Sequence, residues 1–157
     1  GFMKALVIMG VSGSGKTTVG HLLAQKTGGE FLAGDDFHPP ENVAKMSSGI
    51  PLTDDDRQGW LTTLATLIRE AEELTIIACS ALKASYREIL KGAEFVFLNG
   101  SPDLLAERIN QRSGHYMPPG LLQSQLETLE IPLNALTLDV IESPERLVDR
   151  IVSHFNL

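Results

Sequence analysis

The sequence has 157 residues, of which 43% are hydrophobic and 21% are charged, and its formal net charge is −7. This length suits one domain with a buried core, and the acidic balance argues against non-specific nucleic-acid binding, which needs a basic surface. The single cysteine, Cys79, excludes an intrachain disulfide, and no apolar run approaches the ~20 residues that cross a membrane. We expect a cytoplasmic protein with one domain at 3–157, and we interpret Gly1 and Phe2 as a cloning remnant.

Short apolar runs alternate with amphipathic stretches along the chain. The apolar runs predict buried strands at 4–9, 30–33, 74–79, 94–98 and 137–141. The amphipathic stretches predict helices at 17–26, 55–73, 85–91, 102–112, 121–129 and 144–155. Strands separated by helices imply parallel pairing with helices on both faces. We therefore predict an α/β fold of three layers around a parallel sheet of about five strands, with ligands at the carboxyl ends of the strands.

Residues 10–17 match the phosphate-binding pattern G-x-x-x-x-G-K-[ST] in full, between an apolar strand and a helix. Glycines allow the backbone to turn its N–H groups toward phosphate oxygens, and the following helix adds its positive end. Lys16 would place its charge on the β- and γ-phosphates, and Thr17 would offer a hydroxyl to Mg²⁺. The predicted ATP-binding residues of this P-loop are Gly10, Val11, Ser12, Gly13, Ser14, Gly15, Lys16, Thr17 and Thr18.

Two classes of P-loop protein are disfavoured. The letters D-x-x-G occur at 56–59, but at a predicted helix start, and the guanine-binding N-K-x-D of GTPases is absent. Motor-type ATPases end an apolar strand with Asp, whereas the strand at 74–79 ends without an acid. A small-metabolite kinase remains, with acids after the second strand (Asp35 and Asp36) and a lid. Arg108 and Arg112 directly precede a Gly- and Pro-containing loop at 113–120, which we predict to be that lid.

Three groups of residues carry a resemblance to one family. The first is Gly34-Asp35-Asp36-Phe37-His38-Pro39, followed by Asn42, Lys45-Met46, Gly49, Pro51-Leu52, Asp54–Arg57 and Trp60-Leu61. The second is Cys79-Ser80-Ala81-Leu82-Lys83 with Tyr86-Arg87. The third is Arg112-x-Gly114-His115 with Leu121-Leu122-x-Ser124-Gln125 and Leu129-Glu130-x-Pro132. With the P-loop, these segments span nearly the whole chain, and in this respect it resembles the gluconate kinases (gluconokinases). It departs from the family at Gly59, where a proline is usual.

The resemblance implies a nucleoside-monophosphate-kinase-like fold, ATP and Mg²⁺ as cofactors, and a homodimer. It implies transfer of the ATP γ-phosphoryl group to the 6-hydroxyl of D-gluconate. The predicted catalytic residues are Lys16, Asp35 and Arg112, with Asp35 orienting and deprotonating the acceptor hydroxyl. Arg108 and Arg112 are expected on the ATP phosphates or the transferring phosphoryl group. The predicted substrate-binding residues are Asp35, His38, Lys45, Arg57, Lys83, Arg87 and Gln125, the cations suiting a carboxylate.

Two alternatives remain open. The chain could be a kinase for another small polyol acid or a nucleotide, or a catalytically silent nucleotide-binding module. A screen of acceptors distinguishes a gluconate kinase from a kinase for another acceptor. A silent module would bind ATP without any acceptor-stimulated turnover.

Overall fold

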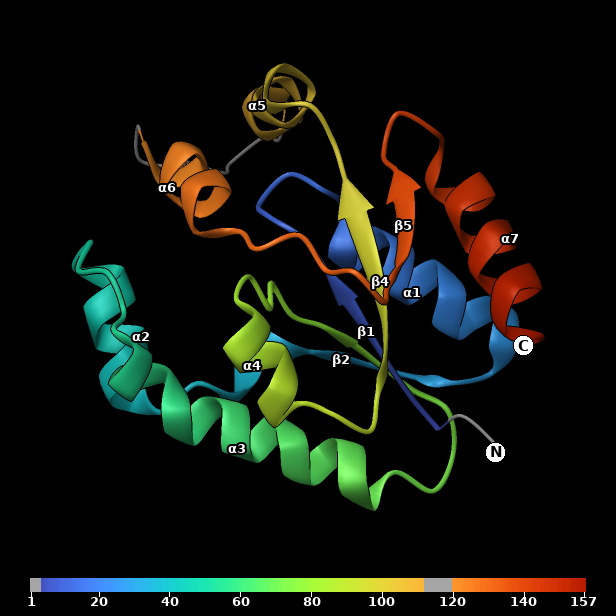
Figure 1. Ribbon diagram of the computed structural model, residues 1–157, viewed down its shortest axis with the longest axis horizontal. Helices are drawn as coiled ribbons and strands as arrows, with labels where there is room; N and C mark the ends of the chain where they lie inside the picture. The colour runs from blue at the N-terminus through green and yellow to red at the C-terminus, as the bar shows by residue number, and fades with distance from the viewer. Residues whose placement is uncertain (1–3, 112–119) are drawn as a thin grey trace.

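The computed structural model describes residues 4–111 and 120–157, and its strands form one parallel sheet (Figure 1). The order across the sheet is β2–β3–β1–β4–β5. The strands are β1 (Ala5–Met9), β2 (Glu30–Ala33), β3 (Thr75–Ala78), β4 (Glu94–Asn99) and β5 (Leu136–Asp139). The predicted fold class and the five predicted strands are therefore confirmed, with ends that differ by one or two residues.

The helices connect the strands as the amphipathic pattern predicts. They are α1 (Lys16–Thr27), α2 (Pro40–Ser47), α3 (Asp54–Glu70), α4 (Ala84–Ile89), α5 (Pro102–Gln111), α6 (Leu121–Thr128) and α7 (Pro144–Phe155). At the start of α3, the Thr53 side chain accepts from the Asp56 N–H, and the Asp56 side chain accepts from the Thr53 N–H. This reciprocal cap holds α3 at a defined starting point.

One helix was not predicted. α2 begins at Pro40, and a 3₁₀ turn, η1 (Gly34–Phe37), precedes it. Proline is well tolerated at the first helical position, because its missing N–H would have no partner there. His38, between η1 and α2, has an extended backbone, with φ −67° and ψ 138°.

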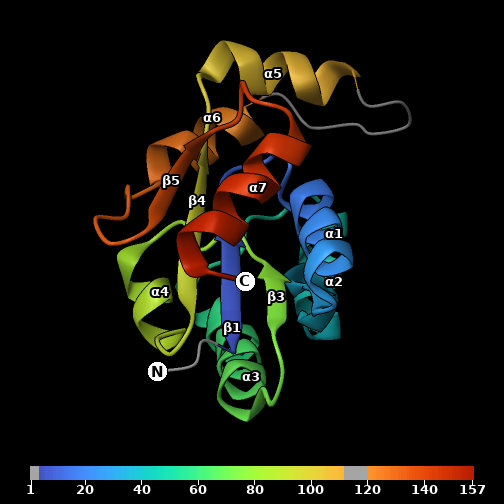
Figure 2. The ribbon, with the colours of Figure 1, turned by 90° about the vertical axis from the view of Figure 1, so that its right-hand side faces the viewer.

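Alternate residues of the central strand β1 enter two separate hydrophobic clusters. Leu6 and Ile8 pack with residues of α1 and α7 on one face, whereas Val7 and Met9 pack with residues of α3 and α4 on the other. Figure 2 shows α1 and α7 on one side of the sheet and α3 and α4 on the other. A strand buried on both faces explains why the run at 4–9 is continuously apolar.

The predicted stripe of α3 lies in the core, where Trp60, Leu61 and Leu64 are almost fully buried. Among the described residues, no helix combines the length and the apolar character required to cross a bilayer. The loops that follow β1, β2 and β3 contain residues 10–15, 34–39 and 79–83, so the sequence motifs meet at the carboxyl edge of the sheet, as predicted.

Candidate active site

The P-loop connects β1 to α1 through backbone conformations that favour glycine. Gly13 has φ +83° and Gly15 has φ +92°. A Cβ at Gly13 would lie 2.9 Å from the Leu105 carbonyl oxygen on α5, so the loop passes directly beneath that helix. The Lys16 ammonium donates to the carbonyl oxygens of Gly10 (3.0 Å) and Val11 (3.1 Å), which places it against the loop.

The start of α1 presents further polar groups. Thr17 and Thr18 are exposed on its first turn, beside the free N–H groups of the helix end. Ser14 is buried, and its hydroxyl donates to the Val11 carbonyl at 2.7 Å, so it braces the loop from within. The tight turn, the exposed hydroxyls and the helix end fit the donor set that a nucleotide phosphate and its Mg²⁺ require.

Two later helices lie over the P-loop. Gln125 of α6 accepts a hydrogen bond from the Ser12 N–H at 2.7 Å, so this side chain contacts the phosphate loop itself. Arg108 is half-buried on α5, one position before Ile109, whose side chain lies against Gly13. Arg112 and residues 113–119 of the predicted lid lie outside the described residues.

Asp35 lies on η1, directly after β2, with 87% of its side chain exposed. The turn is held by Trp60, whose indole N–H donates to the Gly34 carbonyl at 2.7 Å. A Cβ at Gly34 would lie 2.6 Å from the Ala78 carbonyl oxygen, so η1 packs closely against the end of β3. Asp35 is thus presented to solvent from a rigid strand end.

Cys79 lies between the acid and the P-loop lysine. Burial raises the pKa of its thiol to about 12, with the Asp35 charge adding to the increase and the Lys16 charge opposing it. The thiol is therefore no nucleophile at neutral pH. Cys79 follows β3, the strand between β2 and β1, so Asp35 and Lys16 lie at the same edge of the sheet, on either side of it.

His38 is enclosed rather than exposed. Only 3% of its side chain is accessible, and its ring stacks on Trp60 with centroids 4.1 Å apart. Its Nδ1 lies 3.1 Å from Asn42 Nδ2, and its Nε2 lies 3.7 Å from Asp35 Oδ1. Burial lowers its pKa, whereas the Asp35 charge raises it and the Arg57 charge lowers it. His38 therefore faces the candidate base from an enclosed position.

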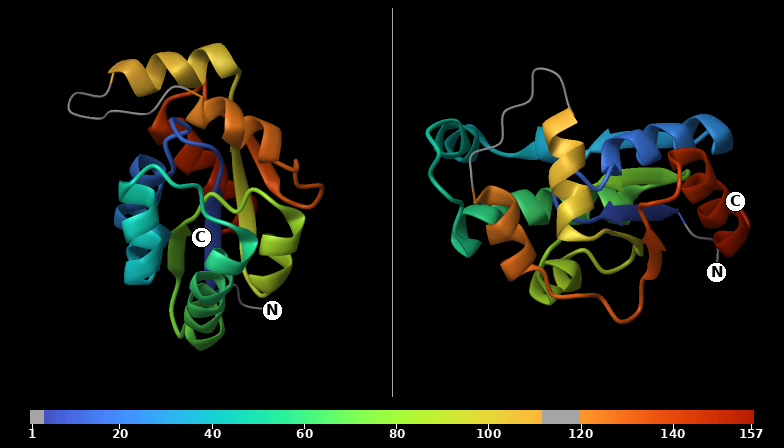
Figure 3. Two further views of the ribbon diagram at one scale, coloured as in Figure 1. Left: turned by 90° about the vertical axis from the view of Figure 1, so that its left-hand side faces the viewer. Right: turned by 90° about the horizontal axis from the view of Figure 1, so that it is seen from above.

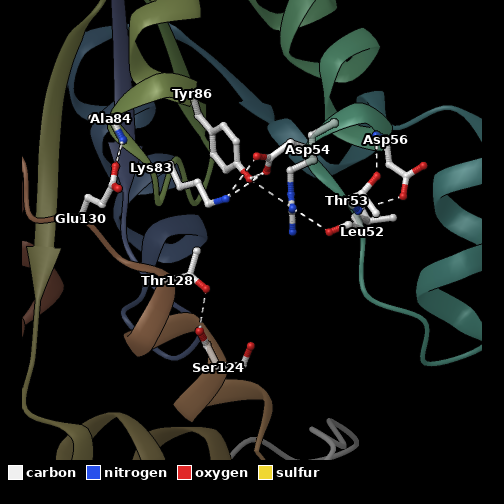
Figure 4. Close-up of polar contacts among 11 residues, drawn as sticks. Leu52, Thr53, Asp54, Asp56, Lys83, Ala84, Tyr86, Ser124, Thr128 and Glu130 are labelled. Atoms are coloured by element: carbon white, nitrogen blue, oxygen red, sulfur yellow. Dashed lines mark hydrogen bonds and ion pairs between the residues drawn. The ribbon is translucent and has the colours of Figure 1, made fainter.

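Three predicted substrate cations contact carboxylates or a phenol near the start of α3, and Figure 4 shows one of them, Lys83, beside Asp54 and Tyr86. Lys83 pairs with Asp54 at 3.1 Å, and the Tyr86 hydroxyl donates to Asp54 at 2.6 Å. Arg57 donates to the Leu52 carbonyl at 2.8 Å and to the Tyr86 hydroxyl at 3.2 Å. The hydrogen bonds from Tyr86 and then Lys83 lower the pKa of Asp54, and its carboxylate in turn raises that of Lys83.

The third cation, Lys45, reaches from α2 to Asp56 at 2.8 Å. This hydrogen bond, together with the cap at Thr53, lowers the pKa of Asp56 to about 2. Seen from the side that faces left in Figure 1, α2, the start of α3, α4 and α6 stand around the P-loop (Figure 3, left). Lys45, Arg57 and Lys83 thus come from three elements that frame the same edge of the sheet.

Arg87 has a different placement from the other predicted cations. Its guanidinium donates to the Ala81 carbonyl and to the Glu130 carbonyl, both at 2.7 Å. The Glu130 side chain also accepts from the Ala84 N–H at 2.6 Å. Arg87 therefore ties α4 to the segment after α6, and its two contacts hold the loop that carries Lys83.

Two surface hollows lie away from this edge. One, of about 530 Å³, lies between β5 and α7, and the other, of about 680 Å³, lies beside α4 and the segment 130–135. Neither is lined by a P-loop residue or by Asp35. The chemistry of the side chains, rather than the size of a hollow, therefore identifies the candidate site.

Comparison with known proteins agrees with this geometry. A family model described as shikimate kinase matches residues 12–146. A gluconokinase of Gluconobacter oxydans (strain 621H) is 46% identical, with 97% of this chain and 91% of the relative covered. The thermosensitive gluconokinase of Escherichia coli (strain K12) is 44% identical, with 82% of this chain and 73% of the relative covered. The chain belongs to the gluconokinase family.

A solved structure supports the same assignment. The crystal structure of a gluconokinase from Sinorhizobium meliloti 1021 superposes with a TM-score of 0.89 at 46% identity, covering 99% of this chain and 93% of that one. The family resemblance stated from the motifs is confirmed. As a member of the gluconokinase family, with a P-loop kinase fold, the chain is an ATP-binding phosphotransferase.

The motif residues of the gluconokinase family include three to which the sequence assigned no role. Asn42, Asp54 and Tyr86 hold His38, Lys83 and Arg57 in the contacts described above. The spacing of four between His38 and Asn42 was the one available signal for the first of them. Asp54 and Tyr86 lie 32 positions apart, so no local pattern connects them.

Proposed function

We propose that this protein transfers the γ-phosphoryl group of ATP to the 6-hydroxyl of D-gluconate, producing ADP and 6-phosphogluconate. One observation carries the proposal: the P-loop lysine follows β1 and the strand-end acid follows β2, so both lie at the carboxyl edge of the sheet, on either side of β3. Phosphoryl transfer requires a phosphate cradle and a group that orients the attacking hydroxyl, and this edge offers both.

The nucleotide would be held by the P-loop. The N–H groups of residues 13 and 15–18 and the Lys16 ammonium would contact the phosphates, and the Thr17 hydroxyl would bind Mg²⁺. The described residues include no cluster of three or more carboxylate, histidine or cysteine side chains able to hold a metal alone. This favours Mg²⁺ entering with the nucleotide, since Mg²⁺ commonly relies on substrate phosphates for part of its coordination. When bound, Mg²⁺ supplies neutralising charge to the phosphate oxygens.

The acceptor would lie between Asp35 and the cations around Asp54. Asp35 would accept the proton of the 6-hydroxyl, because its carboxylate is exposed at the end of β2. Arg57 and Lys83 would bind the gluconate carboxylate, in exchange for contacts that they now make with the Tyr86 hydroxyl and Asp54. Lys45 would add charge from α2.

The remaining predicted residues would act around this centre. Gln125 would control the position of the P-loop through the Ser12 N–H, and Arg87 would position the Lys83 loop. Arg108 and Arg112 would stabilise the transferring phosphoryl group as the lid at 113–120 closes. A single domain over 3–157, a homodimer and a cytoplasmic location stay predictions from the sequence.

The test is ADP release with Mg²⁺-ATP in the presence of D-gluconate, of shikimate, of other polyol acids, or of no acceptor. Gluconate should stimulate turnover, and Asp35→Asn should lower kcat by about 10²-fold or more. Asp36→Asn removes the same charge from the adjacent position and should retain activity within a few-fold. Stimulation by another acid alone would retain the kinase and reject gluconate. ATP binding without any stimulated turnover would identify a silent module.

A further inference from the structure

A chain of polar contacts leads from the start of α3 to Asp35. Asn42 is buried, with 3% of its surface exposed, and its amide nitrogen donates to the Asp56 carbonyl at 2.8 Å. The same nitrogen lies 3.1 Å from His38 Nδ1. An amide nitrogen has two hydrogens, so both of these contacts can be donated at once.

The backbone carbonyl decides the orientation of this amide. If the Asn42 side chain were flipped, its oxygen would face the Asp56 carbonyl oxygen, and two acceptors would be in contact. The Asn42 nitrogen must therefore face both partners. Since that nitrogen only donates, His38 Nδ1 must accept, and the proton of a neutral ring is on Nε2.

The other ring nitrogen points to the candidate base. His38 Nε2 lies 3.7 Å from Asp35 Oδ1, longer than a hydrogen bond, so a proton on Nε2 acts on that carboxylate as a nearby dipole. The stacked Trp60 ring and the low accessibility hold the imidazole in this plane. The charged groups that act on the imidazole are Asp35 on η1 and Arg57 on α3.

We propose that Asn42 is a positioning residue that holds His38 as the neutral Nε2–H tautomer, so that His38 orients the Asp35 carboxylate. This inference rests on the role of Asp35 in the proposed function. A neutral N–H group attracts a carboxylate as a dipole, so it can orient Asp35 without placing a full positive charge beside it. The contact is analogous to the way a third group fixes the tautomer of a histidine in many sites.

The direct readout is the tautomer of the His38 ring, measured in ¹⁵N–¹H correlation spectra of the histidine side chains. The His38 signals are assigned by their absence from the spectrum of a variant that lacks His38. The wild-type ring should show a protonated Nε2 and an unprotonated Nδ1 at pH 7. In Asn42→Asp, an acceptor replaces the donor, so the ring should acquire a proton on Nδ1 and its pKa should rise. A wild-type ring protonated on Nδ1 would overturn the inference, whatever the substrate proves to be.

The kinetic readout separates positioning from folding. Asn42→Asp should lower kcat about tenfold and shift its pH profile, with the KM for ATP within about twofold. Asn134→Asp adds the same charge at an exposed site outside the machinery and should match wild type. His38→Gln, which can place an N–H near the position of Nε2, should retain more activity than His38→Asn. Equal activity of these two variants, or an Asn42→Asp profile that equals that of Asn134→Asp, would refute the proposal.

If the wild type shows no gluconate-dependent turnover, the proposed function fails while the tautomer measurement still decides this inference. Urea denaturation of each variant provides the remaining control. A purely structural Asn42 would lower the free energy of unfolding in Asn42→Asp, but it would leave the His38 tautomer and the pH profile unchanged.

Discussion

Gly13→Ala should damage the P-loop through contact with α5 as well as through backbone strain. At φ +83°, an alanine in this region costs ~1–2 kcal/mol relative to its preferred conformations. Its Cβ would also lie 2.9 Å from the Leu105 carbonyl oxygen and 2.9 Å from Ile109 Cγ1. A backbone carbonyl within α5 cannot yield without moving the helix, and overpacking of this kind typically costs a further ~1–3 kcal/mol.

Gly28→Ala is the matched control, because it imposes the cost of a positive φ on an alanine without a clash at its Cβ. Gly28 ends α1 at φ +77°, and a Cβ there meets nothing within 4 Å. We expect Gly28→Ala to lose ~1–2 kcal/mol in the free energy of unfolding and to bind ATP as wild type does. Gly13→Ala should lose ~2–5 kcal/mol and raise the ATP dissociation constant at least ~10-fold, because the loop N–H groups move with the backbone.

The measurements are urea denaturation without nucleotide and calorimetric titration with Mg²⁺-ATP. Gly15→Ala adds a further control within the P-loop, since φ is +92° there and its Cβ would meet nothing within 4 Å. Equal losses of unfolding free energy in Gly13→Ala and Gly28→Ala would show that α5 does not rest on the P-loop. Unchanged ATP affinity in Gly13→Ala would refute the link between this contact and the phosphate cradle.

Three further outcomes are expected. Gln125→Glu should raise the KM for ATP more than Gln125→Ala does, because a carboxylate beside the P-loop repels phosphate. Gln123→Glu, on an exposed part of α6, should change the KM for ATP little. Equal effects of Gln125→Glu and Gln123→Glu would count against the P-loop contact. Asp56 has a folded pKa of about 2 against an ordinary 3.8, so its contribution to stability is present above pH ~4 and is lost as the pH falls toward ~2. Urea titrations at pH 5 and pH 2.5 should therefore show a smaller acid loss in Asp56→Asn than in wild type, and an identical loss would contradict the lowered pKa. Cys79, with a thiol pKa of about 12, should resist iodoacetamide at pH 8 in the native protein and react with it in urea. Mass spectrometry measures the labelling, and rapid labelling of the native protein would disprove the burial of this thiol.

Local and periodic features were sufficient to predict the fold class and the nucleotide side of the site. The continuous apolar run at 4–9 predicted a central strand with two buried faces, and the P-loop pattern follows it directly. The cap of α3 is a local feature of the same kind, because Thr53 and Asp56 are three positions apart. Asp35 was also predicted at a strand end from local sequence, because β2 ends at Ala33, two positions before it.

Contacts between distant segments could not be predicted in this way. Gln125, Arg87 and Lys83 stay predicted substrate residues by resemblance, and no local pattern indicated their present partners. Gln125 accepts from the Ser12 N–H, 113 positions away, Arg87 donates to two backbone carbonyls, and Lys83 pairs with Asp54. A sequence shows which side chains carry charge, but only the packed sheet determines which charges meet.

The sequence by itself therefore determined the parallel α/β architecture, the phosphate cradle and the family, because these depend on short motifs and on periodic burial. The tertiary structure alone decided that Asn42 faces His38, that Tyr86 joins Asp54 to Arg57, and that α6 contacts the P-loop. The physical reason is that hydrogen bonds act over about 3 Å, and the groups they join reach that distance only after the strands have aligned and their carboxyl ends have come together.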